Sequence, residues 1–564
     1  MIVLGIEGTA WCASAAVHDA DADETAIFSD AYEPESGGIH PREAAEHMAD
    51  AIPEVVDEAL DYAEAEYGPD SVDAVAFSRG PGLGPCLRTV GTAARALAGT
   101  LDVPLVGVNH MVAHLEIGRH QSGFESPVCL NASGANAHLL GFHDGRYRVL
   151  GETMDTGVGN AIDKFTRHAG WSHPGGPKVE AAAAEADPDD LLDLPYVVKG
   201  MDFSFSGIMS AAKAAYDDGE AVEAVCFSLQ EHVFAMLTEV AERALSLTGA
   251  DELVLGGGVG QNDRLREMLA TMCRERGADF HAPEPRFLRD NAGMIAVLGA
   301  KMAAAGDTLA VPDSAVDPDF RPDEVPVTWR SDEAVARTPT TAAKPGTGTA
   351  PTSDVSPGAA GWTDSASDAS ASGAPANRGA EAVVELVETD RVVKRRVAKA
   401  YRHPELDATL RRERTTAEAR LTSEARRVGV PTPLVHDVDL PNATLTLQHV
   451  GDADLAAGLS PERAREVGEH LARLHQAGLV HGDPTTRNVR VDDERAYLID
   501  FGLGYHSGHV EDHAMDLHVF EGSVYGTATA PEALVDAVEE GYASVGDAAV
   551  LERLRTVEGR GRYR

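Results

Sequence analysis

The sequence contains few cysteines, and it has no long apolar run. Its five cysteines are scattered and form no C-x-x-C pair: Cys12, Cys86, Cys129, Cys226 and Cys273. This usage argues against a disulfide framework and predicts buried, reduced thiols. Neither a signal peptide nor an apolar stretch of about 18 residues is present, so we expect neither secretion nor membrane insertion. The sequence therefore predicts a cytoplasmic protein.

Basic residues are also scarce. Asp and Glu number 91 against 48 Lys and Arg, which gives a net charge of −43, and only eight of the basic residues are lysine. The acidic residues are spread through sequence of ordinary apolar content and are not gathered in a tail. Such a solvated, self-repelling surface is typical of proteins from salt-loving organisms and is not in itself a binding face.

The 564 residues are enough for three or four compact units. Residues 1–325 alternate apolar strands with helices, which predicts an α/β architecture. The expected strands are Met1–Ile6, Val72–Ser78, Val103–Val108, Pro127–Ala132 and Glu252–Leu255, and the expected helices are Pro41–Tyr67, Gly84–Gly99 and Asp263–Arg276. Residues 326–377 are rich in Ala, Ser, Thr, Gly and Pro, so we expect a flexible linker there. Residues 378–564 are expected to form a small α+β domain.

The C-terminal unit carries three polar residues at the spacing of a phosphoryl-transfer site. Asp483 ends the run His481-Gly482-Asp483, Asn488 follows five residues later, and Asp500-Phe501-Gly502 begins 17 residues after Asp483. In protein kinases the first Asp accepts the proton of the attacking hydroxyl, while the Asn and the second Asp hold Mg²⁺ on the ATP phosphates. We predict these roles for Asp483, Asn488 and Asp500 respectively.

The residues expected to bind ATP lie further upstream. Lys394 ends an apolar run and is placed like the strand lysine that grips ATP phosphates, with Glu418 on a predicted helix as its ion-pair partner. A G-x-G-x-x-G loop is missing. Its place is taken by Gly379, Ala380 and Glu381, which we predict to contact ATP.

The C-terminal unit is under 190 residues long, which leaves little room for a peptide-binding lobe. Ala530-Pro531-Glu532 looks like the end of a kinase activation segment, but Pro is ordinary at the first turn of a helix. Asp516 looks like the buried aspartate that supports a catalytic loop. These features favour an ATP-hydrolysing or highly selective kinase over a general signalling kinase.

Three stretches of this unit resemble the small atypical kinase of the KEOPS complex. They are Tyr401–Asp407, His481–Asn488 and Arg560-Gly561-Arg562. The resemblance covers nearly all of residues 378–564. It implies an ATPase that supports tRNA modification, with ATP and Mg²⁺ as its cofactors and protein phosphorylation as a secondary activity.

The N-terminal unit has three strand ends that contain glycine. They are Gly5–Thr9, Ser133–Asn136 and Gly256–Asn262, and the third runs directly into a predicted helix. Glycine turns and helix N-termini expose backbone N–H groups that can meet phosphate. Three such turns at these intervals predict an actin/hexokinase-type duplicated α/β fold, with a nucleotide between two lobes.

His110 and His114 stand four residues apart on a predicted helix, so both imidazoles can reach one metal ion. With 22 histidines, about one such pair is expected by chance, and we interpret His509 and His513 as that accidental pair. Met111 follows His110, so the H-E-x-x-H motif lacks its general base and a protease is disfavoured. Asp290 can supply an oxygen ligand from a distant turn.

These motifs together resemble the universal tRNA threonylcarbamoyltransferase family, the catalytic subunit of KEOPS. The stretches that carry the resemblance are Asn109–His114, Gly159–Lys164, Gly175–Glu180, Phe203–Gly207, Gly256–Asn262 and Asp290-Asn291. The match runs in order through residues 1–325. The whole chain thus looks like a fusion of the two KEOPS proteins, and its acidity points to a haloarchaeal source.

The resemblance implies which residues form the transferase site. His110, His114 and Asp290 would hold Fe(II) or Zn(II), and threonylcarbamoyl-AMP would be bound by Asn131, Ala132, Ser133, Gly134, Ala135, Asp163, Gly176, Glu180 and Asn262. One position departs from the family, where a metal-binding Tyr precedes the Gly-rich turn and this chain has Asn131. A neutral amide oxygen is a weaker ligand than a phenolate, so the sequence leaves the coordination number open.

The implied reaction transfers a threonylcarbamoyl group to the adenosine next to the anticodon, in tRNAs that read ANN codons. A divalent metal can polarise the carbonyl or adenylate oxygens while Gly-rich turns fix the nucleotide. Glu7 could order the attacking amine, accept its proton or merely brace the first hairpin. The expected partners are tRNA, threonylcarbamoyl-AMP, ATP and the small dimerising and kinase-activating subunits of KEOPS.

Transfer RNA is an unusual partner for so acidic a chain, because phosphate contacts supply much of tRNA affinity. Residues 391–427 hold 12 Lys or Arg against five Asp or Glu, and Arg560, Arg562 and Arg564 close the chain. We interpret both stretches as tRNA contacts, the alternative being internal ion pairs.

Two other functions remain open from the residues. One is an actin-fold kinase of small metabolites with a regulatory kinase domain, and the other is an ATP-gated scaffold.

Overall fold

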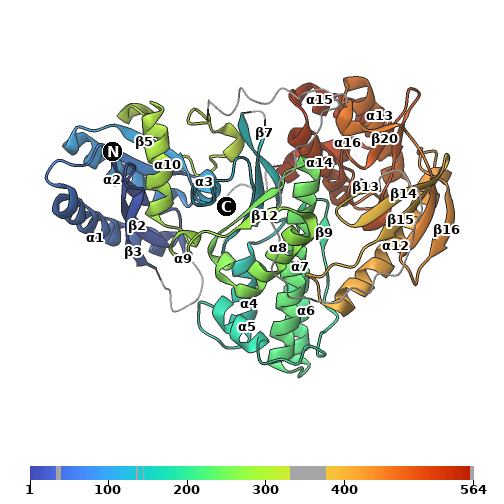
Figure 1. The fold of residues 1–564 in the computed structure, drawn as a ribbon, viewed down its shortest axis with the longest axis horizontal. Coiled ribbons are helices and arrows are strands. Elements are labelled where there is room, and N and C mark those ends of the chain that lie inside the picture. Colours follow the sequence, from blue (N-terminus) through green and yellow to red (C-terminus); the bar gives the residue numbers. More distant parts are fainter. Residues whose placement is uncertain (33–39, 135–136, 144, 331–376, 559–564) are drawn as a thin grey trace, which may run out of the picture.

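The computed structural model describes residues 1–32, 40–134, 137–143, 145–330 and 377–558. Two lobes of an N-terminal unit and a C-terminal unit lie side by side. In Figure 1 the first lobe is at the left, the second lobe is central and the C-terminal unit is at the right. The second lobe therefore lies between the first lobe and the C-terminal unit.

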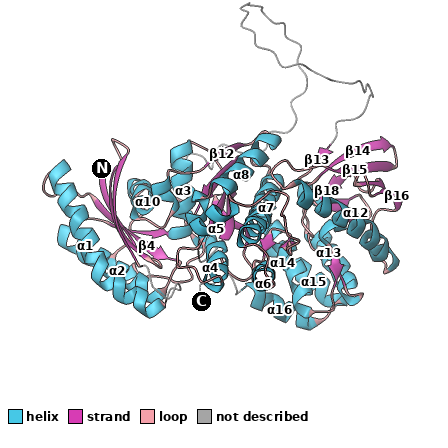
Figure 2. Ribbon diagram, turned by 90° about the horizontal axis from the view of Figure 1, so that it is seen from below, coloured by secondary structure: helices cyan, strands magenta, loops and turns pink. Residues whose placement is uncertain are grey.

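The first lobe is built on a five-stranded sheet of order β3-β2-β1-β4-β5. Its strands are β1 (Ile2–Glu7), β2 (Cys12–Asp19), β3 (Glu24–Ala31), β4 (Ala74–Gly80) and β5 (Leu105–Asn109). Strands β1–β3 are antiparallel, whereas β1, β4 and β5 are parallel. Helices α1 (Pro41–Tyr67) and α2 (Gly84–Leu101) cover one face and α10 (Ala292–Ala304) covers the other, as Figure 2 shows. Both faces are therefore buried, which explains why β1 is apolar at nearly every position.

The second lobe repeats this topology, because its sheet has the order β8-β7-β6-β11-β12. Its strands are β6 (Val128–Ala132), β7 (Ala137–His143), β8 (Arg146–Glu152), β11 (Glu252–Gly256) and β12 (Asp279–His281). Again three antiparallel strands are followed by two parallel ones. The repeat confirms the predicted duplicated α/β fold of the actin/hexokinase type.

The helices, 3₁₀ turns and short hairpin that complete the N-terminal unit lie around its two sheets, and several of them carry residues of the candidate site. They are α3 (His110–Ser122), α4 (Val158–His168), α5 (Gly176–Ala183), α6 (Ser206–Asp217), α7 (Val222–Thr248), α8 (Asp263–Arg276) and α9 (Pro285–Leu288), with the 3₁₀ turns η1 (Gly258–Gln261), η2 (Val311–Asp313) and η3 (Pro322–Glu324) and the hairpin β9 (Val198–Lys199) and β10 (Asp202–Phe203). The predicted helices Pro41–Tyr67 and Asp263–Arg276 are confirmed to the residue.

The C-terminal unit has a five-stranded sheet followed by a mainly helical part. The sheet has the order β13-β14-β15-β17-β16, formed by β13 (Asn377–Arg378), β14 (Ala382–Glu388), β15 (Arg391–Arg396), β16 (Val435–Asp439) and β17 (Thr444–Gln448). The remaining elements are α12 (Pro404–Arg427), β18 (Ala453–Asp454), η4 (Leu455–Ala457), α13 (Pro461–Gln476), β19 (Leu479–Val480), β20 (Val489–Val491), β21 (Ala496–Leu498), η5 (Phe501–Leu503), β22 (Tyr505–His506), α14 (Val510–Thr527), α15 (Glu532–Val545) and α16 (Ala548–Glu558). Leu471, Phe520 and Val538 lie in the core between these helices.

The packed part of the N-terminal unit extends to Arg330, beyond the boundary predicted at residue 325. The Trp329 ring stacks on Tyr147 with centroids 6.4 Å apart, and the Arg330 guanidinium lies 3.7 Å from the Phe142 ring centroid. Residues 326–330 are thus held by aromatic contacts and are not part of the linker. Residues 331–376 lie outside the described part of the chain.

Two expectations about composition can be compared with the structure. All five cysteines are free and buried, as predicted. No helix in the described ranges combines the length and apolar character needed to cross a membrane.

Candidate metal centre and phosphoryl-transfer site

Helix α3 begins at the interface of the two lobes and carries both predicted metal-binding histidines. Asn109 caps it, because its Oδ1 accepts hydrogen bonds from the backbone N–H groups of Met111 and Val112 at 3.0 and 3.1 Å. The cap fixes His110 in the first turn, and His114 follows one turn later on the same face. Their rings are 4.9 Å apart and nearly perpendicular.

Asp290 comes from the turn before α10 and completes a three-residue cluster. Its Oδ1 is 3.4 Å from Nε2 of His110 and 3.4 Å from Nε2 of His114. Two ligands held at about 2.1 Å by a tetrahedral ion lie ~3.4 Å apart, so this spacing fits one shared cation. His114 is buried, and neither of its ring nitrogens has a hydrogen bond among the described residues. The donor set and the unused nitrogens both fit Fe(II) or Zn(II).

Glu7 lies on the Nδ1 side of the His110 ring, whereas Asp290 lies on its Nε2 side. It is fully buried, and its Oε2 is 3.1 Å from Nδ1 of His110 while Oε1 accepts hydrogen bonds from Thr9. Burial alone would lower the pKa of His110, but the carboxylates of Glu7 and Asp290 outweigh it and raise this pKa to about 10. A carboxylate on the second nitrogen of a metal-binding histidine orients the ring and makes it more basic.

Asn131, at the position where the family has a tyrosine, is the last residue but one of β6 and lies close to His114. It is buried, its Oδ1 has no hydrogen bond within the described ranges, and its Nδ2 is 3.5 Å from Nε2 of His138. Burial, followed by the charges of His114 and His110, lowers the pKa of His138 to about 3, so this imidazole is neutral. His138 could not be predicted from the sequence, because a single histidine in a strand has no second ligand at a recognisable spacing.

The predicted nucleotide residues surround the ends of β6 and β11. The carbonyls of Ser133 and Gly134 accept hydrogen bonds from the start of α4, at 3.3 Å from Gly159 and 2.9 Å from Asn160. Ala132 is the last residue of β6. Ala135 lies outside the described residues. The turn after β6 is thus fixed to α4, which carries Asp163.

The other predicted nucleotide residues lie on three neighbouring helices, with Asp163 within α4, Gly176 and Glu180 on α5, and Asn262 as the cap of α8. Oδ1 of Asp163 accepts the Gly175 N–H at 2.8 Å, immediately before Gly176 opens α5. On the same helix, Oε1 of Glu180 accepts the Asp263 N–H at 3.0 Å, next to Asn262, which caps α8. Helices α4, α5 and α8 are therefore linked by hydrogen bonds through these side chains.

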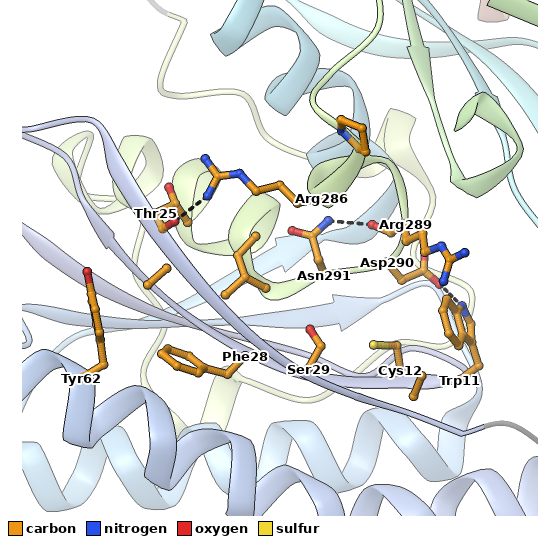
Figure 3. Close-up of a pocket in the computed structure, with 14 residues that line it drawn as sticks. Trp11, Cys12, Thr25, Phe28, Ser29, Tyr62, Arg286, Arg289, Asp290 and Asn291 are labelled. Carbon is orange, nitrogen blue, oxygen red and sulfur yellow. Dashed lines mark hydrogen bonds between the residues drawn. The ribbon is translucent and has the colours of Figure 1, made fainter. Parts of the chain in front are cut away.

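An open cavity of about 620 Å³ lies against Asp290 on the side of β2 and β3. Figure 3 shows Trp11, Arg289 and Asp290 at one end of it and Arg286 towards the other. The Trp11 indole N–H donates to Oδ2 of Asp290 at 3.1 Å, and the Arg289 guanidinium lies 5.9 Å from the Trp11 ring centroid. The cavity therefore presents an aromatic ring and two cations beside the metal cluster.

In the C-terminal unit, Lys394 lies where the spacing places a phosphate-binding lysine. Its Nζ is 2.7 Å from Oε1 of Glu418, which is the predicted ion pair, and 2.7 Å from Oδ1 of Asp500. Arg396 is a second cation that the sequence analysis did not single out, and it contacts Glu418 at 2.7 Å. Burial opposes ionisation of Asp500, but Lys394 and Arg396 overcome it and lower its pKa.

Asp483 and Asn488 also converge. Nδ2 of Asn488 donates to Oδ2 of Asp483 at 3.0 Å. Asp516 supports the same loop, because its carboxylate accepts the N–H groups of His481 and Gly482 at 2.6 and 2.8 Å. The role expected for Asp516 is thus confirmed.

A residue of the N-terminal unit reaches this loop. Nη1 of Arg243 on α7 is 2.9 Å from Oδ2 of Asp483, and Nη2 is 3.0 Å from Oε1 of Glu381. Burial raises the pKa of Asp483 to about 7, although the Arg243 charge acts in the opposite direction. Sequence analysis missed Arg243, because Glu239, Glu242 and Arg243 have the spacing of an exposed helix face.

Residues 379–381, which are predicted to contact ATP, also lie at the contact between the N-terminal and C-terminal units. Besides Arg243, the Glu381 carboxylate binds Arg396 at 2.6 Å and also Arg414, and the Ala380 carbonyl accepts from Lys399. Gly379 pairs its backbone N–H with the carbonyl of Ala382 at 2.9 Å. The Glu381 side chain is thus occupied by arginines.

Several cations of the basic stretch 391–427 are internal. Lys399 contacts Glu242 at 2.6 Å, while Arg402 and Arg414 contact Glu239 at 2.6 and 3.0 Å. These buried cations join the two units, so for them the tRNA-contact interpretation is wrong and the ion-pair alternative holds. Arg560, Arg562 and Arg564 lie outside the described residues.

The fold and the clustered side chains define an enzyme of the duplicated α/β nucleotide-binding class, joined to a unit with phosphoryl-transfer residues. The family model described as tRNA N6-adenosine threonylcarbamoyltransferase matches residues 23–297. Proteins of Halobacterium salinarum and Natronomonas pharaonis are each 66% identical to the chain, over 100% of it and 99% of their own lengths. A Methanosarcina acetivorans protein is 47% identical over the same shares. All three are named as bifunctional tRNA threonylcarbamoyladenosine biosynthesis proteins, and the chain belongs to this family.

Proposed function

We propose that the N-terminal unit transfers the threonylcarbamoyl group of threonylcarbamoyl-AMP to N6 of the adenosine next to the anticodon of tRNA. The observation that carries this proposal is the convergence of His110, His114 and Asp290 beside the end of β6, where the Gly-rich turn begins. In the reaction a bond forms between N6 and the carbamoyl carbon. The bond from that carbon to the adenylate oxygen breaks, AMP leaves and the amine loses one proton.

Fe(II) or Zn(II) held by these three residues would act as a Lewis acid on the carbonyl or adenylate oxygens. Glu7 has a positioning role in this proposal, because it is buried behind His110 and is bound on both oxygens. Its carboxylate keeps the imidazole in one orientation towards the ion site.

The adenylate would bind against the linked helices α4, α5 and α8 of the second lobe. Asp163, Glu180 and Asn262 offer hydrogen-bonding groups to the nucleoside, and the turn of Asn131, Ala132, Ser133, Gly134 and Ala135 with the N–H groups at Gly176 would hold the polar tail of the substrate. The target adenosine would enter by the cavity lined by Trp11, Arg286 and Arg289. An aromatic ring can stack on a base while guanidinium groups contact phosphates.

The C-terminal unit is proposed to be an ATPase and a selective serine/threonine kinase. Lys394 and Glu418, with the backbone of Gly379, Ala380 and Glu381, would hold ATP, and Asn488 and Asp500 would hold Mg²⁺. Asp483 would orient the attacking water or hydroxyl. We place the activity in the cytoplasm, with the small dimerising and kinase-activating subunits of KEOPS as partners.

The test is nucleoside mass analysis of tRNA incubated with the protein, threonine, bicarbonate, ATP and an adenylate-forming enzyme. We expect threonylcarbamoyladenosine with the native chain and none with a His114→Ala/Asp290→Ala double variant. His509→Ala is the matched control, because His509 is exposed and belongs to the accidental pair. Modification that persists in the double variant would favour the scaffold, and phosphorylation of a sugar or acid by the N-terminal unit would favour a metabolite kinase.

A further inference from the structure

We propose that His138 is a positioning residue that holds the Asn131 amide with its oxygen facing the His110, His114 and Asp290 cluster, so that Asn131 becomes a fourth protein ligand. This inference rests on the metal centre of the proposed function. It assigns a role to a residue that neither the family resemblance nor the spacing singled out. It also gives a contact partner to Asn131, the residue at which the chain departs from the family's tyrosine.

The two side chains lie on the sheet face that α3 covers. Asn131 of β6 and His138 of β7 are directly opposite in the antiparallel ladder, so they share one face. Cys129 and Leu140, the next ladder pair on that face, pack in the same core as Val112 and Leu115 of α3. The α3 helix packs closely against β11 of this sheet, because a Cβ on Gly118 would lie 2.1 Å from the Val254 side chain.

The oxygen of Asn131, which has no hydrogen bond in the described part of the chain, faces the end of β11 beside His114. A Cβ built on Gly256 would lie 3.4 Å from Oδ1 of Asn131 and 3.5 Å from Cβ of His114. On Gly257, which has a φ of +83°, a Cβ would lie 2.6 Å from the same oxygen. The two glycines therefore leave room for the amide beside the histidine. A buried carbonyl oxygen without a hydrogen bond is costly, and a cation would satisfy it.

His138 determines which end of the amide faces the cluster. The amide NH₂ group is a donor and cannot bind a cation, whereas its oxygen can. A neutral imidazole whose Nδ1 carries the proton presents Nε2 as an acceptor, and Nε2 is the atom 3.5 Å from Nδ2 of Asn131. This contact therefore favours the orientation with the oxygen towards His114. Nδ1 of His138 has no hydrogen bond among the described residues, so no competing partner turns the ring.

Cobalt(II) titration of the chelator-stripped, full-length protein tests the idea, because its visible absorption reports affinity and coordination number without any assay of activity. We expect His138→Leu and Asn131→Leu each to weaken Co²⁺ binding roughly 10–100-fold, as loss of supporting residues does at metal sites. The double variant should be no weaker than Asn131→Leu alone, because both changes remove one interaction. His232→Leu is the control, since His232 is a buried neutral histidine on α7 whose Nδ1 contacts the Ser228 carbonyl.

Asn131→Asp separates positioning from folding. Both ends of a carboxylate are oxygen, so in this background His138→Leu should lower Co²⁺ affinity less than about twofold. His138→Leu binding within twofold of the native chain, or losses that add in the double variant, would overturn the inference. A His114→Ala variant that titrates like the native protein would instead refute the metal centre itself. Thermal unfolding of each variant identifies any that fail to fold.

Discussion

Arg243 of the N-terminal unit forms an ion pair with Asp483 of the C-terminal unit, with Nη1 and Oδ2 2.9 Å apart. Both side chains are largely buried, and Glu381 shares the guanidinium. The proposed proton acceptor for ATP hydrolysis is thus bound by the proposed tRNA-modifying unit. Near the same loop, the Gly482 carbonyl accepts the Gly200 N–H at 2.8 Å.

Replacement of Arg243 by Leu should speed ATP hydrolysis by the intact chain. The guanidinium occupies the carboxylate oxygen that would orient the attacking water, and a hydrogen bond to a charged group is worth about 1.5–3 kcal/mol. We expect a rate increase of roughly tenfold, measured as phosphate release at saturating ATP and Mg²⁺ and at a pH well above 7, where Asp483 is ionised in both proteins. Arg42→Leu is the control, because Arg42 is exposed and pairs with Glu46 on the surface of α1. An unchanged or lower rate for Arg243→Leu would contradict this prediction.

The pH dependence of kcat/KM for ATP hydrolysis should have its acid limb near pH 7. Burial raises the pKa of Asp483 to about 7, so the ionised, active form is lost as the pH falls below that value. The positive charge of Arg243 lowers this pKa, so Arg243→Leu should move the midpoint to higher pH. Asp483→Asn should lower the rate roughly 10²–10⁴-fold. An acid limb that survives in this variant would assign the titration to another group.

Loss of a buried charge at the interface of the two units should destabilise the protein strongly. Glu242→Gln leaves the Lys399 ammonium, which Glu242 contacts at 2.6 Å, without its carboxylate partner. Breaking such a buried pair costs about 3–5 kcal/mol. Thermal or urea unfolding measures the loss. Glu46→Gln on α1, in a pair exposed to solvent with Arg42, should leave stability unchanged.

Glu7→Gln should weaken metal binding without opening the site. The substitution keeps the shape of the side chain but removes the charge beside Nδ1 of His110, at 3.1 Å. We expect roughly 10–100-fold lower affinity for Fe(II) or Zn(II), measured by competition with a chromophoric chelator. Native metal affinity with native transfer activity would mean that Glu7 only braces the first hairpin. Native metal affinity with lost transfer activity would indicate that Glu7 accepts a proton.

Two substitutions of Trp11 should separate its two contacts. Trp11→Phe keeps an aromatic ring in the cavity but removes the N–H that donates to Asp290 at 3.1 Å, so metal affinity should fall more than tRNA affinity. Trp11→Ala should weaken both, with roughly 1–3 kcal/mol lost from base stacking. Filter-binding titration with tRNA and chelator competition for the metal provide the two readouts. Equal tRNA affinity for Trp11→Ala would exclude stacking.

Patterns over short distances in the chain could be predicted because they depend on local geometry. The i, i+4 spacing of His110 and His114 already sets one face of α3, and the predicted helix is present. Likewise the spacing of Asp483, Asn488 and Asp500 predicted a shared site, and the Lys394–Glu418 ion pair is present. Boundaries were less secure, because Trp329 and Arg330 are held by aromatic partners more than 180 residues earlier in the chain.

The sequence by itself determined the duplicated fold, the family and the types of residue that carry the chemistry, because helix period, strand pattern and motif spacing are local properties. Only the tertiary structure decided the pairing of residues far apart in the chain. Arg243 meets Asp483 across 240 residues, and Glu7 supports His110 across 103. The ladder of β6 and β7 sets Asn131 opposite His138. No local pattern encodes these contacts, since they arise from how separately stable elements pack and bury their charges.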